Sequence, residues 1–153
     1  MSNNDAVWKP HVTVAAVCKR DDRFLLVREK LEGQEVLNQP AGHLEPGETL
    51  HQAVVRETLE ETAYDFLPTG IVGIYRYVIG TSNKTYLRFA FAGDVGHRHA
   101  RDLDAGILGA EWLSLAEIEA ERDRLRTPMV LQCILDYQAN RAYPLQLISP
   151  EFA

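Results

Sequence analysis

Cysteine is scarce in this chain: of its 153 residues, only Cys18 and Cys133 carry a thiol. Two cysteines are too few for a disulfide framework and are not spaced as a zinc site, so we expect two reduced thiols. Long apolar runs are also lacking, since no segment approaches the roughly 18 apolar residues of a membrane span. Residues 1–10 have neither the basic nor the apolar region of a secretory leader. The sequence therefore predicts a cytoplasmic protein that does not enter a membrane.

Positive charge is in short supply as well. Lys and Arg total 16 against 22 Asp and Glu, which gives a formal net charge of -6. This balance disfavours binding to nucleic acid polymers or anionic membranes, whereas a small phosphorylated molecule can still bind through a bridging cation. Internal repeats and low-complexity tracts are missing, and the seven prolines are scattered rather than gathered in a linker. We expect one domain over residues 1–153, as a monomer or homodimer.

The first half of the chain has the pattern of short strands. His11–Cys18 is rich in β-branched residues and Arg23–Arg28 is a second apolar run, with polar residues 19–22 between them, which predicts a hairpin. Val36–Gln39 is typical of a further short strand. Residues 41–47 hold enough Gly and Pro to predict a loop.

The second half alternates strands and helices. Two runs around a Gly-Thr-Ser-Asn turn predict a second hairpin, and later segments predict a polar loop, a strand, a short capped helix and a last helix that opens on Thr127-Pro128. These elements are Ile71–Ile79, Thr85–Ala92, residues 97–109, Ala110–Leu113, the capping box from Ser114, and the helix to Tyr137. The expected fold class is α/β, with a mixed β-sheet and helices packed against it.

The segment after Thr49 predicts the clearest helix in the chain. Thr49 and Gln52 have the spacing of a capping box, so we expect a helix from Leu50 to about Thr62. One face of it starts as an apolar stripe and continues as three carboxylates. The members of this face are Leu50, Ala53, Val54, Glu57, Glu60 and Glu61.

The three glutamates on this face need an explanation. Like charges three and four residues apart repel, and carboxylates near a helix C-terminus meet the negative end of the helix dipole. A solvated glutamate-rich surface is one interpretation. The continuity with the apolar stripe favours the other, a divalent-cation site, because hard carboxylate oxygens suit Mg²⁺ or Mn²⁺.

Residues 42–64 spell a known signature. They read GHLEPGETLHQAVVRETLEETAY and resemble the Nudix box, G-x5-E-x7-R-E-U-x-E-E-x-G-U, where U is a bulky apolar residue. The residues that match are Gly42, Glu48, Arg56, Glu57, Glu60 and Glu61. Thr58 replaces the first apolar position, and Ala63 stands where the family has Gly. If Ala63 adopts a left-handed conformation, its β-carbon costs about 1 kcal/mol.

The resemblance extends beyond the box. KPHVTVAAV, NQPAGHLE, LRFAFA, RTPMV and RAYPLQLI are similar to bacterial phosphatases of the Nudix family. The likeness implies an α/β/α sandwich and a Mg²⁺-dependent hydrolase, with Mn²⁺ as a possible substitute. It further implies small-molecule phosphoanhydride substrates: nucleoside triphosphates and diphosphates, hydroxymethylpyrimidine pyrophosphate and thiamine pyrophosphate.

The resemblance also implies roles for the box residues. Glu57, Glu60 and Glu61 are the expected metal ligands, and Arg56 is expected to orient a box glutamate. The likeness implies that Glu48 supports the helix and Arg56, and that Gly42 lets the backbone approach the metal or substrate. Family members often add an acidic residue from a later loop. Asp104, with Asp102 as the alternative, is the candidate for a further ligand or general base, and an ordinary loop acid is the competing interpretation.

Substrate-binding residues are harder to identify from the sequence. Arg28 and Arg88 are strand cations that could meet phosphate oxygens, and Tyr77 could stack on a heterocycle. Each could equally belong to an ordinary sheet surface or core. Arg76, Tyr75 and Phe89 have the same ambiguity.

Two other functions stay open. One is a Nudix hydrolase of another substrate class, such as dinucleoside polyphosphates or oxidised nucleotides. The other is a non-catalytic, nucleotide-sensing Nudix module, which the retained box glutamates disfavour.

Overall fold

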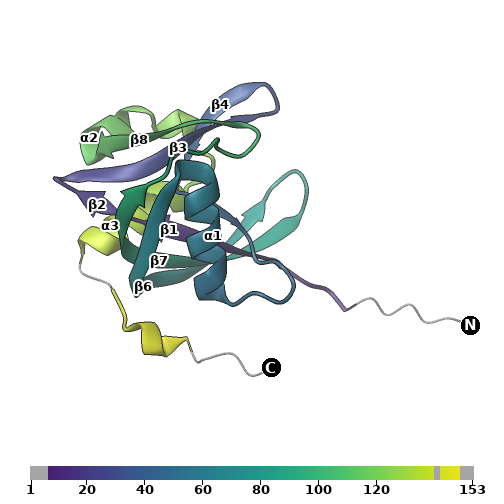
Figure 1. Ribbon diagram of the computed structural model, residues 1–153. Coiled ribbons are helices and arrows are strands. Elements are labelled where there is room, and N and C mark those ends of the chain that lie inside the picture. The colour runs from purple at the N-terminus through teal and green to yellow at the C-terminus, as the bar shows by residue number, and fades with distance from the viewer. Residues whose placement is uncertain (1–6, 140–141, 149–153) are drawn as a thin grey trace, which may run out of the picture.

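A computed structural model describes residues 7–139 and 142–148 (Figure 1). The prediction made for residues 1–10 concerns a segment that lies mostly outside the described residues. The strands are β1 His11–Val17, β2 Lys19–Arg20, β3 Arg23–Leu31, β4 Gln34–Asn38, β5 Ala41–His43, β6 Tyr64–Ile79, β7 Lys84–Arg98 and β8 Ile107–Ser114. The helices are α1 Leu50–Thr62, α2 Leu115–Ala120, α3 Met129–Gln138 and the 3₁₀ turns η1 Arg122–Arg124 and η2 Leu145–Leu147. Among the described residues, no helix is long and apolar enough to cross a membrane.

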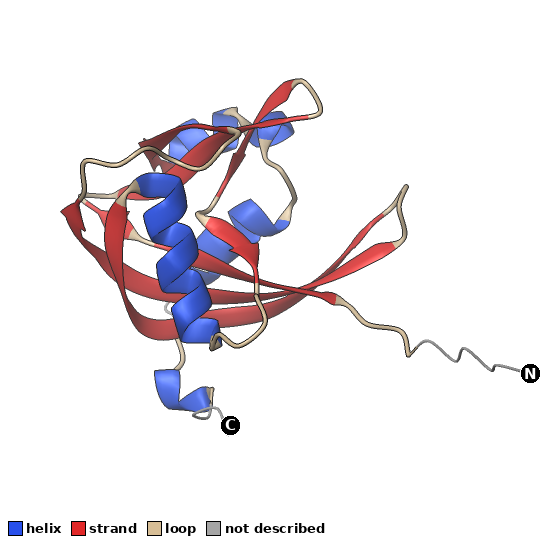
Figure 2. Ribbon diagram, turned by 45° about the vertical axis from the view of Figure 1, so that its right-hand side comes forward, coloured by secondary structure: helices blue, strands red, loops and turns tan. Residues whose placement is uncertain are grey.

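The strands form two sheets (Figures 1 and 2). The first has the order β5-β1-β7-β6 and is mixed, because β1 runs parallel to β7 while the other pairs are antiparallel. In the second, β3 lies between β4 and β8 and also pairs with β2. The predicted mixed sheet with packed helices is therefore confirmed.

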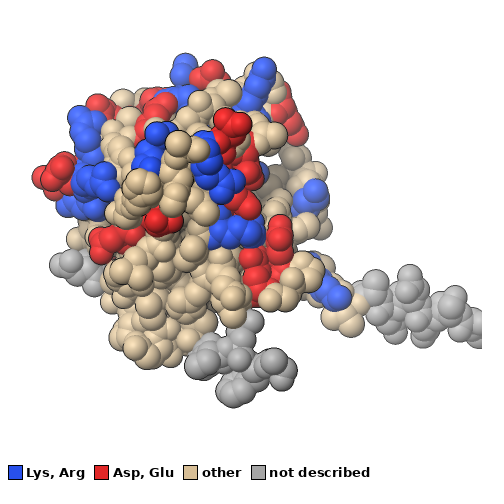
Figure 3. Space-filling view, in the orientation of Figure 1, with Lys and Arg blue, Asp and Glu red and all other residues tan. Residues whose placement is uncertain are grey.

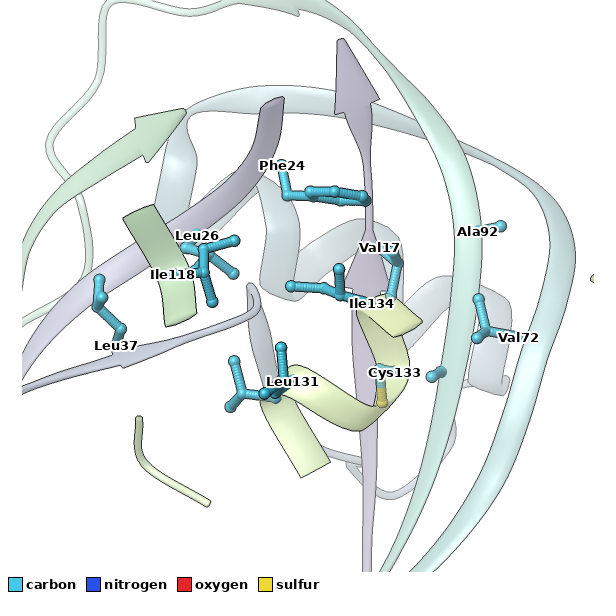
Figure 4. Close-up of a cluster of buried hydrophobic side chains, with 12 residues drawn as sticks. Val17, Phe24, Leu26, Leu37, Val72, Ala92, Ile118, Leu131, Cys133 and Ile134 are labelled. Carbon is cyan, nitrogen blue, oxygen red and sulfur yellow. The ribbon is translucent and has the colours of Figure 1, made fainter. Parts of the chain in front are cut away.

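Helices cover both faces of the first sheet. Side chains alternate along a strand, so Val14 and Ala16 of β1 pack in the cluster that contains Ala53 of α1, while Val17 joins the opposite cluster with Cys133 of α3. Figure 4 shows this second cluster between β1 and α3. Phe24 and Leu26 of the second sheet extend it, which ties the two sheets together. The resulting α/β/α arrangement is the one that the family resemblance implies.

The first predicted hairpin is wrong. Residues 19–20 form the separate strand β2, and it is β2 that pairs with β3 around Asp21 and Asp22. β1 instead pairs with β5 and β7 in the other sheet. Local sequence predicted the strands correctly, but the choice of partner strand depends on contacts that are distant along the chain.

Several predicted boundaries also need correction. Part of the expected loop at 41–47 forms the short strand β5, which pairs with β1. The second hairpin is confirmed, but β6 and β7 extend well beyond it and β7 takes residues 97–98 from the expected polar loop. In α3, Pro128 is the N-cap and no capping bond from Thr127 is present.

Helix α1 has the predicted bounds and the predicted capping box. The Thr49 hydroxyl accepts from the Gln52 amide at 3.0 Å, and the Gln52 side chain accepts from the Thr49 amide at 2.8 Å. Thr58, the departure from the box, is fully buried and donates its hydroxyl to the Val54 carbonyl at 2.8 Å. Because this bond stays within the helix, a polar residue replaces an apolar one without an unpaired group.

The helix ends at Ala63 in a left-handed conformation with φ 63°, and the Ala63 amide donates to the Leu59 carbonyl. This is the conformation for which the family's Gly is suited. Ala63 is also fully buried. Its methyl group therefore contributes about 0.8 kcal/mol through burial, which offsets most of the backbone strain.

We predict that Ala63→Gly changes the free energy of unfolding by less than about 1 kcal/mol, because relief of strain is balanced by loss of the buried methyl and by a more flexible unfolded chain. Ala63→Val should lower it by more than about 2 kcal/mol, because a β-branched residue is strained and overpacked there. Chemical denaturation of both variants measures the difference. Equal stability of the Val variant and the parent would contradict the left-handed helix end.

Candidate active site

Arg56 is the centre of an ion network at the surface of α1. Its guanidinium donates to Glu48 at 2.7 and 2.9 Å, to Glu57 at 2.8 Å and to Glu60 at 3.0 Å. A further bond at 3.0 Å reaches the carbonyl of His43. Arg56 thus offsets the repulsion between the helix glutamates and fastens the loop before α1 to the helix.

Glu48 and Gly42 shape the loop against this network. The Glu48 carboxylate also accepts from the Glu45 amide at 2.8 Å, and the Arg56 guanidinium beside it lowers the pKa of Glu48. Gly42 lies directly against Glu57, so that a β-carbon at position 42 would overlap the Glu57 carboxylate. Only glycine allows the loop backbone to approach that closely.

Glu57 and Glu61 project from the helix into the protein rather than into solvent. Each residue is only 8% exposed. Burial raises the pKa of Glu57 despite the opposing effect of Arg56, and the neighbouring Glu60 and Asp104 raise it further. Burial raises the pKa of Glu61 to about 8, although its carboxylate accepts a bond of 2.9 Å from the Ala41 amide.

The residues fit a divalent cation in their chemistry. Burial raises the pKa values of Glu57 and Glu61, and a bound cation would stabilise the charged form of both carboxylates. Within the described residues, no three His, Cys, Asp or Glu side chains are already grouped to hold a metal ion, and Arg56 binds two of the helix glutamates. The carboxylates of α1 are thus chemically suitable ligands for a divalent cation, and the Arg56 guanidinium lies between Glu57 and Glu60.

A cavity of about 350 Å³ opens beside the two buried glutamates. Its wall combines the loop before α1, the β6–β7 hairpin and the segment that leads into α3. The lining residues include Asn38, Gly42, His43, Glu57, Glu61, Tyr77, Tyr86, Arg88, Arg126 and Thr127. A cavity of this size with a few polar groups is typical of a small-molecule site.

Two predicted substrate residues, Tyr77 and Arg88, line this cavity. Arg88 is 5% exposed and donates to Gln39 at 3.0 Å and to Asn38 at 3.2 Å. These partners are neutral amides, and Nε of Arg88 and the Thr127 hydroxyl are buried without a partner. In the described part of the chain no carboxylate forms an ion pair with Arg88, so its charge is available to an anionic ligand.

Arg28 is in a different place. It lies in the second sheet and donates twice to Glu111, at 2.8 and 3.0 Å, and twice to Glu121, at 3.1 and 3.2 Å. Arg28 does not line the cavity. The expectation that it meets substrate phosphates is therefore corrected, because carboxylates of β8 and of the end of α2 already neutralise it.

Glu60 and Asp104 lie at the edge of the site. Neither lines the cavity, although Asp104 acts electrostatically on Glu57 and its amide donates to the Glu60 carbonyl at 3.0 Å. The loop acid expected near the glutamates is thus brought close to them. Figure 3 shows acidic and basic side chains side by side over the upper part of the face that carries α1, while the lower part is mostly uncharged.

Sequence reasoning missed several cavity residues. The rings of His43 and Tyr86 lie beside that of His11, which stacks on Tyr86 with 5.1 Å between the ring centroids. Arg126 forms an ion pair of 2.8 Å with the buried Glu29. The sequence held only weak signs of their role, since His43 follows the box glycine and Arg126 precedes the predicted last helix. Nothing in the local sequence shows that these two segments meet in the fold.

A cavity with buried carboxylates on one wall and a buried arginine on another has the chemistry expected of an enzyme that binds small phosphorylated molecules. The NUDIX domain profile matches residues 9–132, and the chain therefore belongs to the Nudix family. It is a Nudix hydrolase that acts on phosphoanhydrides.

Its relatives agree. The chain is similar to Phosphatase NudJ from Escherichia coli (strain K12), 37% identical over 147 residues that cover 93% of this chain and 92% of the relative. It is 50% identical to a NUDIX hydrolase from Nitrosomonas europaea, with a TM-score of 0.91 over 94% of this chain and 98% of that chain. The NUDIX domain of Shewanella oneidensis NrtR, solved with ADP ribose, is 18% identical with a TM-score of 0.71, over 91% of this chain and 93% of that chain, and supports the fold alone.

We predict that Glu61 makes the metal-free protein less stable as the pH rises. Because its pKa is about 8 when folded and about 4.5 when unfolded, the folded state holds an extra proton between these values, and stability falls as pH increases through that window. Glu61→Gln should flatten this slope and raise the Tm at pH 8.5 by about 5 °C or more. Thermal melts with EDTA from pH 4.5 to 8.5 test this, and the exposed Glu119→Gln is the control. A parallel slope in parent and Glu61→Gln would contradict the buried carboxylate.

Proposed function

We propose that the protein is a Mg²⁺-dependent hydrolase of nucleoside triphosphates, nucleoside diphosphates and related pyrophosphates such as hydroxymethylpyrimidine pyrophosphate and thiamine pyrophosphate. One observation carries the proposal: a single cavity has buried carboxylates on one wall and a buried, un-neutralised arginine on another. The likeness to NudJ supports a phosphatase of this kind. We propose that one domain, as a monomer or homodimer, carries the activity.

The box glutamates are the proposed metal ligands. Glu57, Glu60 and Glu61 would hold Mg²⁺, or Mn²⁺ in its place, which supplies charge neutralisation at the phosphate oxygens and a lowered pKa for the attacking water. Arg56 positions Glu57 and Glu60 through its bonds of 2.8 and 3.0 Å. Asp104, next to Glu57, is the proposed general base or further acidic ligand.

The reaction itself is a displacement at phosphorus. The oxygen of water forms the new bond, the bridging phosphoanhydride bond breaks, and the leaving phosphate departs with the electron pair while the water's proton passes to a carboxylate. Arg88 would receive the negative phosphate or ring edge, and Tyr77 would contact the heterocycle. Glu48 and Gly42 keep the loop close to Glu57.

A second substrate class is the alternative. Fold neighbours include a UDP-X diphosphatase and the NrtR domain solved with ADP ribose, so the same fold accepts other pyrophosphates. Dinucleoside polyphosphates or oxidised nucleotides are therefore the competing substrates. A non-catalytic nucleotide sensor is disfavoured because the box glutamates are retained.

We predict that Glu60→Gln lowers kcat with Mg²⁺ at least about 10²-fold, because it removes one ligand charge. Its Tm without metal should stay within about 2 °C of the parent, since the amide oxygen can still accept the Arg56 bond. Steady-state phosphate release and thermal melts measure the two effects, with Glu119→Gln as the control. Parent-like turnover would remove Glu60 from the catalytic group, and a fall of many degrees in Tm would make it structural.

We also predict a broad substrate range. The cavity offers charge to the phosphates and the aromatic faces of Tyr77 and Tyr86 to the ring. Ring stacking selects weakly, because strong selection needs buried hydrogen bonds to one ring edge. The kcat/KM values for nucleoside triphosphates, nucleoside diphosphates and hydroxymethylpyrimidine pyrophosphate should lie within about two orders of magnitude. Assays that measure orthophosphate and pyrophosphate separately provide the comparison. Activity confined to a dinucleoside polyphosphate would support the alternative instead.

A further inference from the structure

Arg126 enters the cavity from a segment outside the Nudix box. It lies between η1 and α3, and its amide donates to the Leu37 carbonyl at 2.8 Å, next to a bridge between Leu37 and Leu125. The backbone at position 126 is therefore fixed to β4. Its guanidinium lines the same cavity as Glu61 and Arg88.

A buried carboxylate holds the Arg126 side chain. Glu29 on β3 is 8% exposed, and its Oε1 accepts from Nη1 of Arg126 at 2.8 Å. Burial of a carboxylate is costly unless a cation pairs with it. The pairing of β3 with β8 shifts register between Arg28 and Glu29. The Arg28 side chain bonds Glu111 and Glu121, whereas the Glu29 side chain bonds Arg126, which lines the cavity.

The position of Arg126 gives the cavity two walls of opposite charge. Arg126 acts electrostatically on Glu61 of the acidic wall, on the exposed His43 and on Arg88. Its effect lowers the pKa of each of these three groups, as a nearby positive charge must. All four side chains line the same cavity, so one ligand in it can meet Arg126 together with the other three.

The bond to Glu29 leaves part of the guanidinium for a ligand. Within the described residues, Glu29 accepts a hydrogen bond from Nη1 alone, and the Arg126 side chain, which lines the cavity, is 37% exposed. An arginine fork donates two parallel bonds to a phosphate group. A carboxylate behind it holds the fork in place, which reduces the entropy lost on binding.

We propose that Arg126 binds phosphate oxygens of the substrate on the side facing away from the glutamate helix, and that Glu29 is the residue that positions it. This inference rests on the proposed function and adds a phosphate-binding residue outside the Nudix box. The competing explanation is a purely structural ion pair that ties β3 to the segment before α3.

Arg126→Ala tests the proposal. With Mg²⁺, we expect kcat/KM for a nucleoside diphosphate to fall at least about 30-fold, and the affinity for its non-hydrolysable α,β-methylene analogue, measured by calorimetry, to fall at least about tenfold. Arg124→Ala is the matched control, because Arg124 lies two residues away with a more exposed side chain and only a 3.9 Å pairing. It should change neither value more than about twofold.

Two conservative variants separate the roles. Arg126→Lys keeps the charge and the pairing with Glu29 but loses the fork, so we expect at least about fivefold weaker analogue binding with a parent-like Tm. Glu29→Gln leaves only a neutral hydrogen bond in place of the ion pair, so Arg126 keeps its charge but is held less firmly, and KM should rise more than kcat falls. If Arg126→Ala does not fold, Arg126→Lys decides the question.

Failure of the Arg126 proposal can be distinguished from failure of the proposed hydrolase function. Analogue affinity within threefold of the parent in Arg126→Lys, or in a folded Arg126→Ala, would overturn the proposal and leave a structural ion pair. A parent protein that cleaves none of the pyrophosphates would overturn the proposed function instead. Analogue binding that depends on Arg126 would still support the phosphate site in that case.

Discussion

The site depends on the ion pairs that the Arg56 guanidinium forms with three glutamates. Three glutamates at the C-terminal half of α1 repel one another and face the wrong end of the helix dipole. Arg56 binds two of them and Glu48 at the same time. Because Glu48 and the His43 carbonyl belong to the loop before the helix, the same side chain also brings that loop against Glu57. Loop position and carboxylate position are therefore set together.

The cavity is built from charges that the protein only partly neutralises. Glu57 and Glu61 are buried on one wall, and Arg88 is buried on another with amides as its partners. Burying ionisable groups costs folding free energy, which Arg56 and the amide partners offset only in part. A ligand with phosphate groups and a bound cation would satisfy both walls at once. The free energy that this burial costs is thus related to the binding that the site provides.

The parts of the structure that sequence could predict are those fixed by short spacing. The capping box at Thr49 and the bounds of α1 follow from residues within one helix, and the structure confirms them. The first hairpin failed because β1 chooses β5 and β7 as partners, which are distant in the chain. The family's Gly at position 63 raised the question of a left-handed helix end, which Ala63 adopts, but its complete burial was not visible in the sequence. The pairing of Glu29 with Arg126 joins residues 97 positions apart and left no local signal.

Arg28 and Arg88 show why a site cannot be assigned from residue type alone. Both are strand arginines among apolar neighbours, and sequence reasoning treated them alike. In the folded chain Arg28 meets two carboxylates, which neutralise it and raise its pKa. Arg88 meets two amides, and burial lowers its pKa. An arginine whose donors are taken up by four bonds to two carboxylates, as in Arg28, has little to offer a phosphate. Arg88, held by amides, keeps its charge, and Arg126, held by one carboxylate through Nη1, keeps donors free while its orientation is fixed. What makes an arginine a candidate ligand-binding residue is therefore the chemistry of its fixed partners, and only the fold supplies that information.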